Sequence, residues 1–305
     1  MIGLPLGREL ERNVTVVPFG FQLWDRLTSQ PVSDQLTVVG TTPGGIRRTA
    51  TAGPSSTFSL RHRASSWAFT SGAGDDGFWA SPPAIAAKWS MRVTDGAGRF
   101  MPFTFDIEGA TRVGRAAREV CGIGPAASSS NVIGLPEPAG NPPDDRSIPV
   151  LPLFSTPARP VPSGHASIVL QLADQDGRPV AGALVRATLP RSRPAFGMSD
   201  GRGMAVIPVP YPELEDAHAS PPAGTPKRLQ QQSWPATIEF FSDPNLKKTS
   251  QPELCAVLAQ LERQPARIDG QPPATRSIKT TLEYGMPLVV SAPGRSEVRI
   301  RVASS

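Results

Sequence analysis

Short apolar segments separated by turn residues run through most of the chain, a pattern typical of β-strands. At 103–108 apolar and polar residues alternate, as one half-buried face requires, and at 297–302 Val298, Ile300 and Val302 share one face. Further strands are predicted at 21–24, 36–39, 58–60, 168–172, 180–189, 204–209, 237–241 and 288–291. The pattern therefore predicts a mainly β protein.

One unit occurs twice: an apolar strand, an Asp-led turn closing on Pro-Val, a second strand, and a Gly-containing turn into a third strand. The first copy spans residues 21–60 and the second spans 167–210. With 305 residues, the chain can bury a core in each of two domains. We predict two β-sandwich domains, an N-terminal one at 1–110 and a C-terminal one at 149–305, joined by a Pro/Gly/Ser-rich linker at 111–148.

One short amphipathic helix is predicted in the second domain. Ser250 and Glu253 have the spacing of a capping box, and apolar residues follow at 254, 257, 258 and 261 before Pro265 ends the run. We expect this helix to cover one end of the sandwich; the alternative is an exposed helix that binds a partner. Residues 113–120, inside the linker, are a second candidate helix.

Composition favours a folded chain with many turns. The 35 prolines and 28 glycines together make up about a fifth of the 305 residues. This fraction is below the roughly 25–30% of proline and glycine that is typical of disordered proteins. The chain has no run of about 18 apolar residues, and its first nine residues lack a signal-peptide pattern. Cys121 and Cys255 are the only cysteines, which fits a reducing compartment and two buried unpaired side chains, although a bridge between them stays open. A cytoplasmic protein without membrane insertion is expected.

The charge balance is mildly basic, with a formal net charge of +5 and a pI of about 9.7. Arginine supplies most cations, which fits either protein interfaces, where arginine is enriched, or a genome rich in G and C. Basic residues cluster at 47–48, 61–63 and 247–248, with acidic residues spread among them. Nucleic-acid binding requires a basic face with stackable aromatic residues, so we do not expect it.

The sequence offers no set of residues for catalysis, cofactor binding or metal binding. The three histidines, His62, His165 and His218, are isolated, and they lack metal-ligand spacing with the cysteines. A nucleophile elbow, a phosphate-binding loop and a dinucleotide fingerprint are absent. The acidic groups at 75–76, 144–145 and 213–216 lack the spacing of a calcium loop. We therefore predict no catalytic, cofactor or metal residues and no enzyme activity.

Tryptophans are the residues most suited to binding a sugar or a partner. Five occur, at positions 24, 67, 79, 89 and 234. Such rings are more often part of a sandwich core, but one that faces solvent would anchor a ligand.

The second copy of the repeated unit resembles a known family. Asp176-Gly177-Arg178-Pro179-Val180-Ala181-Gly182-Ala183-Leu184-Val185, followed by Ser199-Asp200-Gly201-Arg202-Gly203, is similar to the carboxypeptidase regulatory-like domain. The resemblance implies a transthyretin-like or Ig-like β-sandwich that serves as an accessory or adhesive module and carries no catalytic residues. The first copy departs from the pattern, because Thr28 and Ser29 stand near the position where glycine is expected.

The whole chain more loosely resembles accessory proteins of contractile, phage-tail-like injection systems. The segments that carry this resemblance are 95–102, 149–155, 159–162, 233–235 and 254–257. It implies a structural subunit at a baseplate, cap or collar, with other protein subunits as partners, in symmetric copies, in a soluble particle. The Pro-rich arms at 148–162 and 221–226 would dock on those partners. The alternative is a glycan- or surface-binding module.

Overall fold

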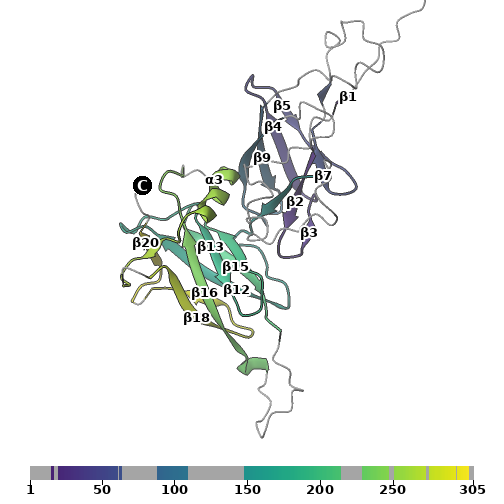
Figure 1. Ribbon diagram of the computed structural model, residues 1–305. Helices are drawn as coiled ribbons and strands as arrows, with labels where there is room; N and C mark the ends of the chain where they lie inside the picture. The colour runs from purple at the N-terminus through teal and green to yellow at the C-terminus, as the bar shows by residue number, and fades with distance from the viewer. Residues whose placement is uncertain are drawn as a thin grey trace, which may run out of the picture.

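The computed structural model describes residues 15–16, 20–60, 62–63, 88–108, 148–213, 229–246, 251–272, 275–292 and 294–301. The chain forms two bodies built of β-sheets, with helix α3 lying between them (Figure 1). The mainly β fold with β-sandwich domains that the sequence predicts is confirmed, and α3 is the single α-helix among the described residues.

Two larger sheets and one two-stranded sheet make up the described part of the first body. One has the strand order β10-β9-β4-β5, and the other has the order β11-β2-β7-β6, with β3 also paired to β2. Strands β1 (Thr15–Val16) and β8 (His62–Arg63) pair with each other. The bounds are β2 Gly20–Asp25, β3 Gln30–Pro31, β4 Leu36–Thr41, β5 Arg47–Thr49, β6 Thr51–Ala52, β7 Thr57–Ser59, β9 Lys88–Asp95, β10 Phe103–Glu108 and β11 Val150–Leu153.

The second body also has two sheets. Their orders are β15-β12-β20-β17, with β19 also paired to β12, and β14-β13-β16-β18. A 3-10 turn, η2 (Leu229–Gln231), precedes β16. The bounds are β12 His165–Ala173, β13 Leu184–Thr188, β14 Ala195–Met198, β15 Met204–Pro210, β16 Ser233–Phe241, β17 Arg267–Ile268, β18 Ser277–Glu283, β19 Leu288–Val290 and β20 Val298–Arg301.

Each body has an apolar core between its sheets, and the core of the first body continues into the second. The second core lies within the second half and includes Ile168, Leu170 and Val298. The first core contains aromatic residues of the first half, such as Phe21 and Phe105, which meet edge to face with ring centroids 5.2 Å apart. It also contains residues of β13, β14, β16 and α3: Leu184, Phe196, Met198, Phe241, Leu254, Val257 and Leu258. The two halves are therefore joined by a shared apolar core.

Helix α3 (Leu254–Ala259) lies at this junction and continues into a 3-10 turn, η3 (Gln260–Glu262). Its N-cap is Glu253, whose side chain accepts hydrogen bonds from the backbone N–H groups of Cys255 and Ala256. The predicted capping box instead placed Glu253 inside the helix. The Thr104 N–H donates to the Pro252 carbonyl at 3.0 Å, so the segment before the helix covers the outer edge of β10. The helix covers one end of the second sandwich, as predicted, and packs there against the first half.

Turn geometry explains two departures from the sequence analysis. Gly177 has φ +79°, as expected for the Asp-led turn, and Ser29 adopts φ 53° near the position in the first copy where glycine was expected. The strand predicted at 180–189 begins only at Leu184. The buried Ser199 hydroxyl donates to the Val180 carbonyl and accepts from the Ala183 N–H, which holds this segment in a turn.

Strand β11 belongs to a sheet of the first body, although the sequence analysis assigned residues from 149 onward to the second domain. It pairs in parallel with β2, with Leu151 opposite Leu23 and Leu153 opposite Asp25. The pairing buries Leu151 and Leu153 in the shared core, which explains why these apolar residues join the first half.

Several sequence predictions lie outside the described residues. They concern the linker predicted at 111–148, as far as residue 147, with its candidate helix at 113–120, the acidic groups at 75–76 and 144–145 and most of the one at 213–216, the basic pair at 247–248, the arm at 221–226, and the side chains of Trp67, Trp79, Cys121, His62 and His218.

Candidate functional site at the junction of the two halves

A buried ion pair fixes the connection between the halves. Asp25 ends β2 and Arg159 follows β11; the side-chain exposures are 3% and 11%. Arg159 Nη1 donates to Asp25 Oδ1 at 2.9 Å, and Nη2 donates to Oδ2 at 2.6 Å. The carboxylate also accepts from the Leu27 N–H and the Thr28 hydroxyl. Two-point pairing of this kind fixes both distance and orientation.

The electrostatics of the pair favour the charged carboxylate. Burial raises the pKa of Asp25, but the hydrogen bonds from Arg159 and Thr28 oppose that effect, and the resulting pKa lies below the ordinary value of 3.8. Asp25 is therefore ionised at neutral pH, and its charge is compensated by Arg159.

The turn between β9 and β10 packs against the segment that carries Arg159. Asp95 ends β9 and accepts from the backbone N–H groups of Ala97, Arg99 and Phe100. Two guanidinium groups lie close to the Phe100 ring, with the Cζ of Arg159 at 4.6 Å and the Cζ of Arg99 at 5.2 Å from its centroid. The Met101 N–H donates to the Phe154 carbonyl, and the Thr156 N–H donates to the Arg99 carbonyl.

This packing corrects the expectation that 148–162 is a docking arm. Leu151, Leu153 and Phe154 are buried in the shared core, and Arg159 is engaged by Asp25. Two of the segments that carry the resemblance to injection-system proteins pack against each other inside the chain, namely 95–102 and 149–155. The segment at 148–162 is thus an internal connector.

Arg26 crosses from the first half to the second. Its Nη2 donates to the Pro194 carbonyl at 3.0 Å, and its Cζ lies 4.8 Å from the centroid of the Phe196 ring. Pro194 lies in the segment that leads into β14 and Phe196 lies in β14 itself, so Arg26 holds the two halves together beside the ion pair.

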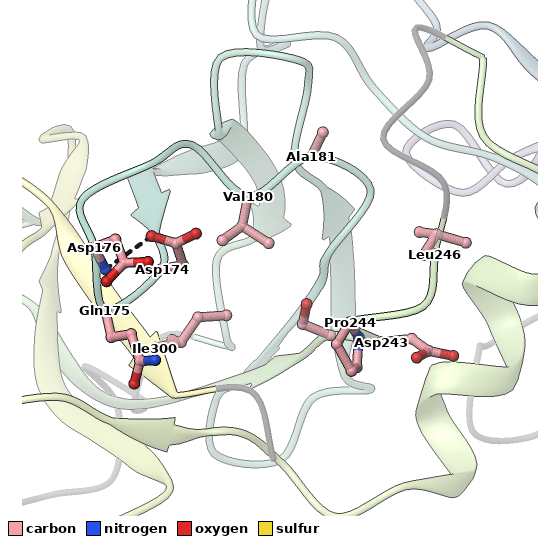
Figure 2. A pocket seen from close by; sticks show the side chains of 10 residues that line it. Asp174, Gln175, Asp176, Val180, Ala181, Asp243, Pro244, Leu246 and Ile300 are labelled. Carbon is pink, nitrogen blue, oxygen red and sulfur yellow. Dashed lines mark hydrogen bonds between the residues drawn. The ribbon is translucent and has the colours of Figure 1, made fainter. Parts of the chain in front are cut away.

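A cavity of about 180 Å³ lies beside the Asp-led turn of the second half (Figure 2). Asp174 and Asp176 stand on one side of it and Asp243 on the other. Asp174 accepts from the N–H groups of Asp176 and Arg178, and Asp243 pairs with Arg263 at 2.8 Å. These carboxylates stabilise turns and an ion pair. Among the described residues, no group of three or more His, Cys, Asp or Glu side chains could hold a metal ion.

Of the three tryptophans whose side chains the structure describes, Trp89 and Trp234 are core residues, whereas Trp24 is half-buried. Trp89 is 1% exposed and Trp234 is 6% exposed, as the sequence analysis expected. Tyr211 lies beside Trp234 and Tyr284, with ring centroids 5.6 and 4.6 Å away. Both tyrosines are half-buried, so they are the partly solvent-facing aromatic rings at this end of the second body. Neither tyrosine was identified from the sequence, in which only the tryptophans stood out as candidate binding residues.

The cysteines differ from the expected unpaired state. Cys255, on the junction helix α3, is disulfide-bonded. The only other cysteine in the sequence is Cys121, which lies outside the described residues. Since disulfides persist mainly in oxidising compartments, cysteine usage gives no support to the expected cytoplasmic location.

The junction residues were not identified from sequence. In the sequence Asp25 stands in an Asp-led turn and Arg159 in a Pro-rich segment, and nothing near these two residues or Arg26 signals that they meet. His165 was singled out as an isolated histidine, and together with Arg26 it lines a second cavity, at the junction of the halves. No described helix has the length and apolar character needed to cross a membrane.

Comparisons with known proteins leave the family open. The chain matches no family model and no curated protein. Among solved structures, it is similar to the Bacillus anthracis TIE protein, with TM-score 0.24, 9% identity, and coverage of 94% of this chain and 34% of that chain. A candidate adhesin from Bacteroides ovatus gives TM-score 0.24 and 8% identity over 95% of this chain and 94% of that one. A C-terminal fragment of the pilus adhesin SpaC from Lactobacillus rhamnosus GG gives TM-score 0.19 and 9% identity over 93% and 95%.

This chain spans about a third of the length of the TIE protein chain that it matches. At TM-scores of this size the likeness carries no argument about function.

Proposed function

We propose that this chain is a non-enzymatic structural or adaptor subunit, which holds partner proteins of a larger assembly at a fixed separation. The observation that carries the proposal is the apolar core shared by both halves, together with the buried pair of Asp25 and Arg159. A two-domain body joined in this way loses little conformational freedom when it binds, because its halves are already held in one arrangement.

Free sheet edges supply surfaces for such partners. β18 forms the outer edge of its sheet, is seven residues long, and exposes Lys279, Thr281 and Glu283. Pro235 of β16 stands opposite Thr281 and has no N–H to donate. We infer that the backbone N–H of Thr281 points to the free edge, where an added strand could bind it.

The finer proposal is a contractile, phage-tail-like injection system, with the chain at a baseplate, cap or collar. It rests on the loose resemblance of the whole sequence. Similarity of the second copy to the carboxypeptidase regulatory-like domain supports a module without catalytic residues. Genes for sheath, tube and baseplate proteins next to the gene for this chain would support the injection system, and their absence would remove it.

Copurification tests the assembly role. The tagged full-length chain, expressed in its source organism, is expected to sediment with a large particle in a fixed ratio to other subunits. Thr281→Pro is expected to lower its incorporation by removing an outward donor, whereas the matched Thr281→Ala variant keeps that donor and should assemble normally. A chain that sediments alone under all extraction conditions, with both variants behaving alike, would refute the role.

A glycan- or surface-binding module is the second candidate, and the aromatic cluster favours it. Tyr211 and Tyr284 are partly exposed, and Met286 beside them is 60% exposed. Partly exposed aromatic rings are suited to stacking on sugar rings. Retention of the isolated chain on a polysaccharide column, lost in Tyr284→Ala and kept in Thr281→Ala, would favour this candidate over the assembly role.

A further inference from the structure

The cavity at the junction of the two halves has a volume of about 290 Å³. Its wall comes from the turn after β2, the end of β11, the start of β12, the segment that leads into β14, and β15. Its volume is near the lower end of the roughly 300–1,000 Å³ range of ligand pockets. Because both halves contribute to the wall, this junction cavity exists only in the joined protein.

Positive charge exceeds negative charge in this wall. The basic side chains are Arg26, Arg193 and His165, and the acidic side chain is Asp25. The Asp25 carboxylate is already engaged by Arg159 at 2.6 Å. Arg193 is exposed, and no carboxylate pairs with it within the part of the chain that the structure describes. Two arginines therefore line the cavity without an anionic partner among the described residues.

Arg26 shows that hydrogen-bonding capacity is left unused here. Its Nη2 donates to the Pro194 carbonyl, but Nε and Nη1 are buried without a hydrogen-bond partner. Buried donors without a partner are rare, because each one lowers the stability of the folded state. Burial lowers the pKa of Arg26 to about 10, so the group is still charged at neutral pH. An anion near it would compensate a buried charge that the protein itself leaves unpaired.

We propose that this junction cavity binds a small ligand that carries one carboxylate, held by Arg26 and Arg193. A planar carboxylate matches the guanidinium fork, and attraction between the charges acts even before Nε and Nη1 become accessible. A rotation of the Arg26 side chain is needed for these two donors to bind directly. Pro194, Phe196 and Pro208 form an apolar part of the wall, which suits the ring of an acidic sugar or an aromatic acid.

Asp25 favours a monoanion over a phosphate. Its carboxylate lines the same cavity, so a dianion would meet stronger repulsion than a carboxylate would. The ligand class proposed here does not depend on the assembly role, because the cavity belongs to the joined chain whether or not partners bind elsewhere.

The test is titration of the full-length chain with D-glucuronate and with benzoate, followed by calorimetry and protein NMR. At least one of these carboxylates is expected to bind saturably at millimolar concentration, with D-glucose inert and inorganic phosphate weaker. Arg193→Gln is expected to weaken binding about tenfold, the loss of one charge-assisted hydrogen bond. Arg191→Gln is the matched control, because Arg191 is exposed on the same loop and does not line the cavity.

A second variant keeps the proposal testable if one side chain dominates. Arg26→Gln, checked for an unchanged circular dichroism spectrum and thermal transition, is expected to weaken binding at least as much as Arg193→Gln. The proposal is overturned if neither carboxylate binds, if phosphate binds as tightly as the carboxylates, or if Arg191→Gln weakens binding as much as Arg193→Gln. It is equally overturned if both cavity variants bind like the unmodified chain.

Discussion

Arg159 forms a two-point ion pair with Asp25, which lies 134 residues earlier in the sequence, and both side chains are buried beside the shared core. Neither charge reaches water to any large extent, so each depends on the other for its compensation. The pair ties the connector after β11 to the end of β2, which makes the junction sensitive to the loss of either residue.

Arg159→Gln is expected to destabilise the chain by about 3–5 kcal/mol at pH 7, because it leaves the Asp25 carboxylate buried and unpaired. Chemical denaturation measures this loss. Arg178→Gln is the control, since Arg178 and Asp176 form an exposed pair at 3.8 Å, and it should cost at most about 1 kcal/mol. Adding Asp25→Asn to Arg159→Gln should cost less than the sum of the single losses; additive losses would show that the pair is not coupled.

The cost of Arg159→Gln should depend on pH. In the unmodified protein the pKa of folded Asp25 lies below 3.8, so its stabilising contribution is complete well above that value and is lost as pH falls through the folded pKa. Without Arg159, fewer hydrogen bonds oppose the effect of burial on the Asp25 carboxyl. The pKa of Asp25 in the folded state therefore rises. Denaturation at pH 7 and pH 3 should therefore show a smaller difference between variant and parent at pH 3. An equal stability difference between variant and parent at both pH values would argue against ionised Asp25 as the partner of Arg159.

Three glycines of the second copy should respond differently to alanine. Gly203 has φ +77°, and a Cβ there would collide with the Leu172 carbonyl, so Gly203→Ala is expected to be the most destabilising. Gly177 has φ +79° but more space, and Gly177→Ala should cost about 1–2 kcal/mol. At Gly201 an added Cβ would meet no atom within 4 Å, so Gly201→Ala should change stability by less than about 0.5 kcal/mol. Thermal denaturation ranks the three, and a different order would show that the turn relaxes.

Leu254→Ala should weaken both halves at once. Leu254 is 1% exposed and lies in the core shared across the junction, and removing its side chain should cost about 2–5 kcal/mol. Hydrogen exchange read by mass spectrometry is expected to increase in β10 as well as in β13 and β16. Leu170→Ala is the matched control, because Leu170 belongs to the second core alone. If Leu254→Ala leaves β10 unchanged, the halves are energetically independent.

Cys255 should be found oxidised in the purified protein. Since Cys121 is the only other cysteine, thiol titration of the denatured, non-reduced chain is expected to find no free thiol, and peptide mapping is expected to join residues 121 and 255. Cys255→Ser should lower stability by about 2–5 kcal/mol relative to the oxidised parent. Two titratable thiols before reduction would contradict the disulfide. In that case the serine variant should have the same stability as the reduced parent.

Local patterning determined the strands that the sequence analysis found. The alternation at 103–108 corresponds to β10, and the buried Val298 and Ile300 of β20 share a face as predicted, because side chains alternate across a strand. The positive φ of Gly177 is typical of the glycine in an Asp-led turn. Strand β18 was missed, since its alternation mixes threonine, lysine and glutamate with only two large apolar residues.

Only the tertiary structure decided how the halves are joined. β11 could have continued the second domain, and it joined the first because Leu151 and Leu153 find a buried face beside β2. Asp25 and Arg26 are neighbours in one turn, but Arg159 and Arg193 come from two distant segments, so no spacing in the sequence brings the three segments together. A pattern along the chain reports on contacts within an element, whereas the ion pair and the junction cavity depend on where distant segments meet in space.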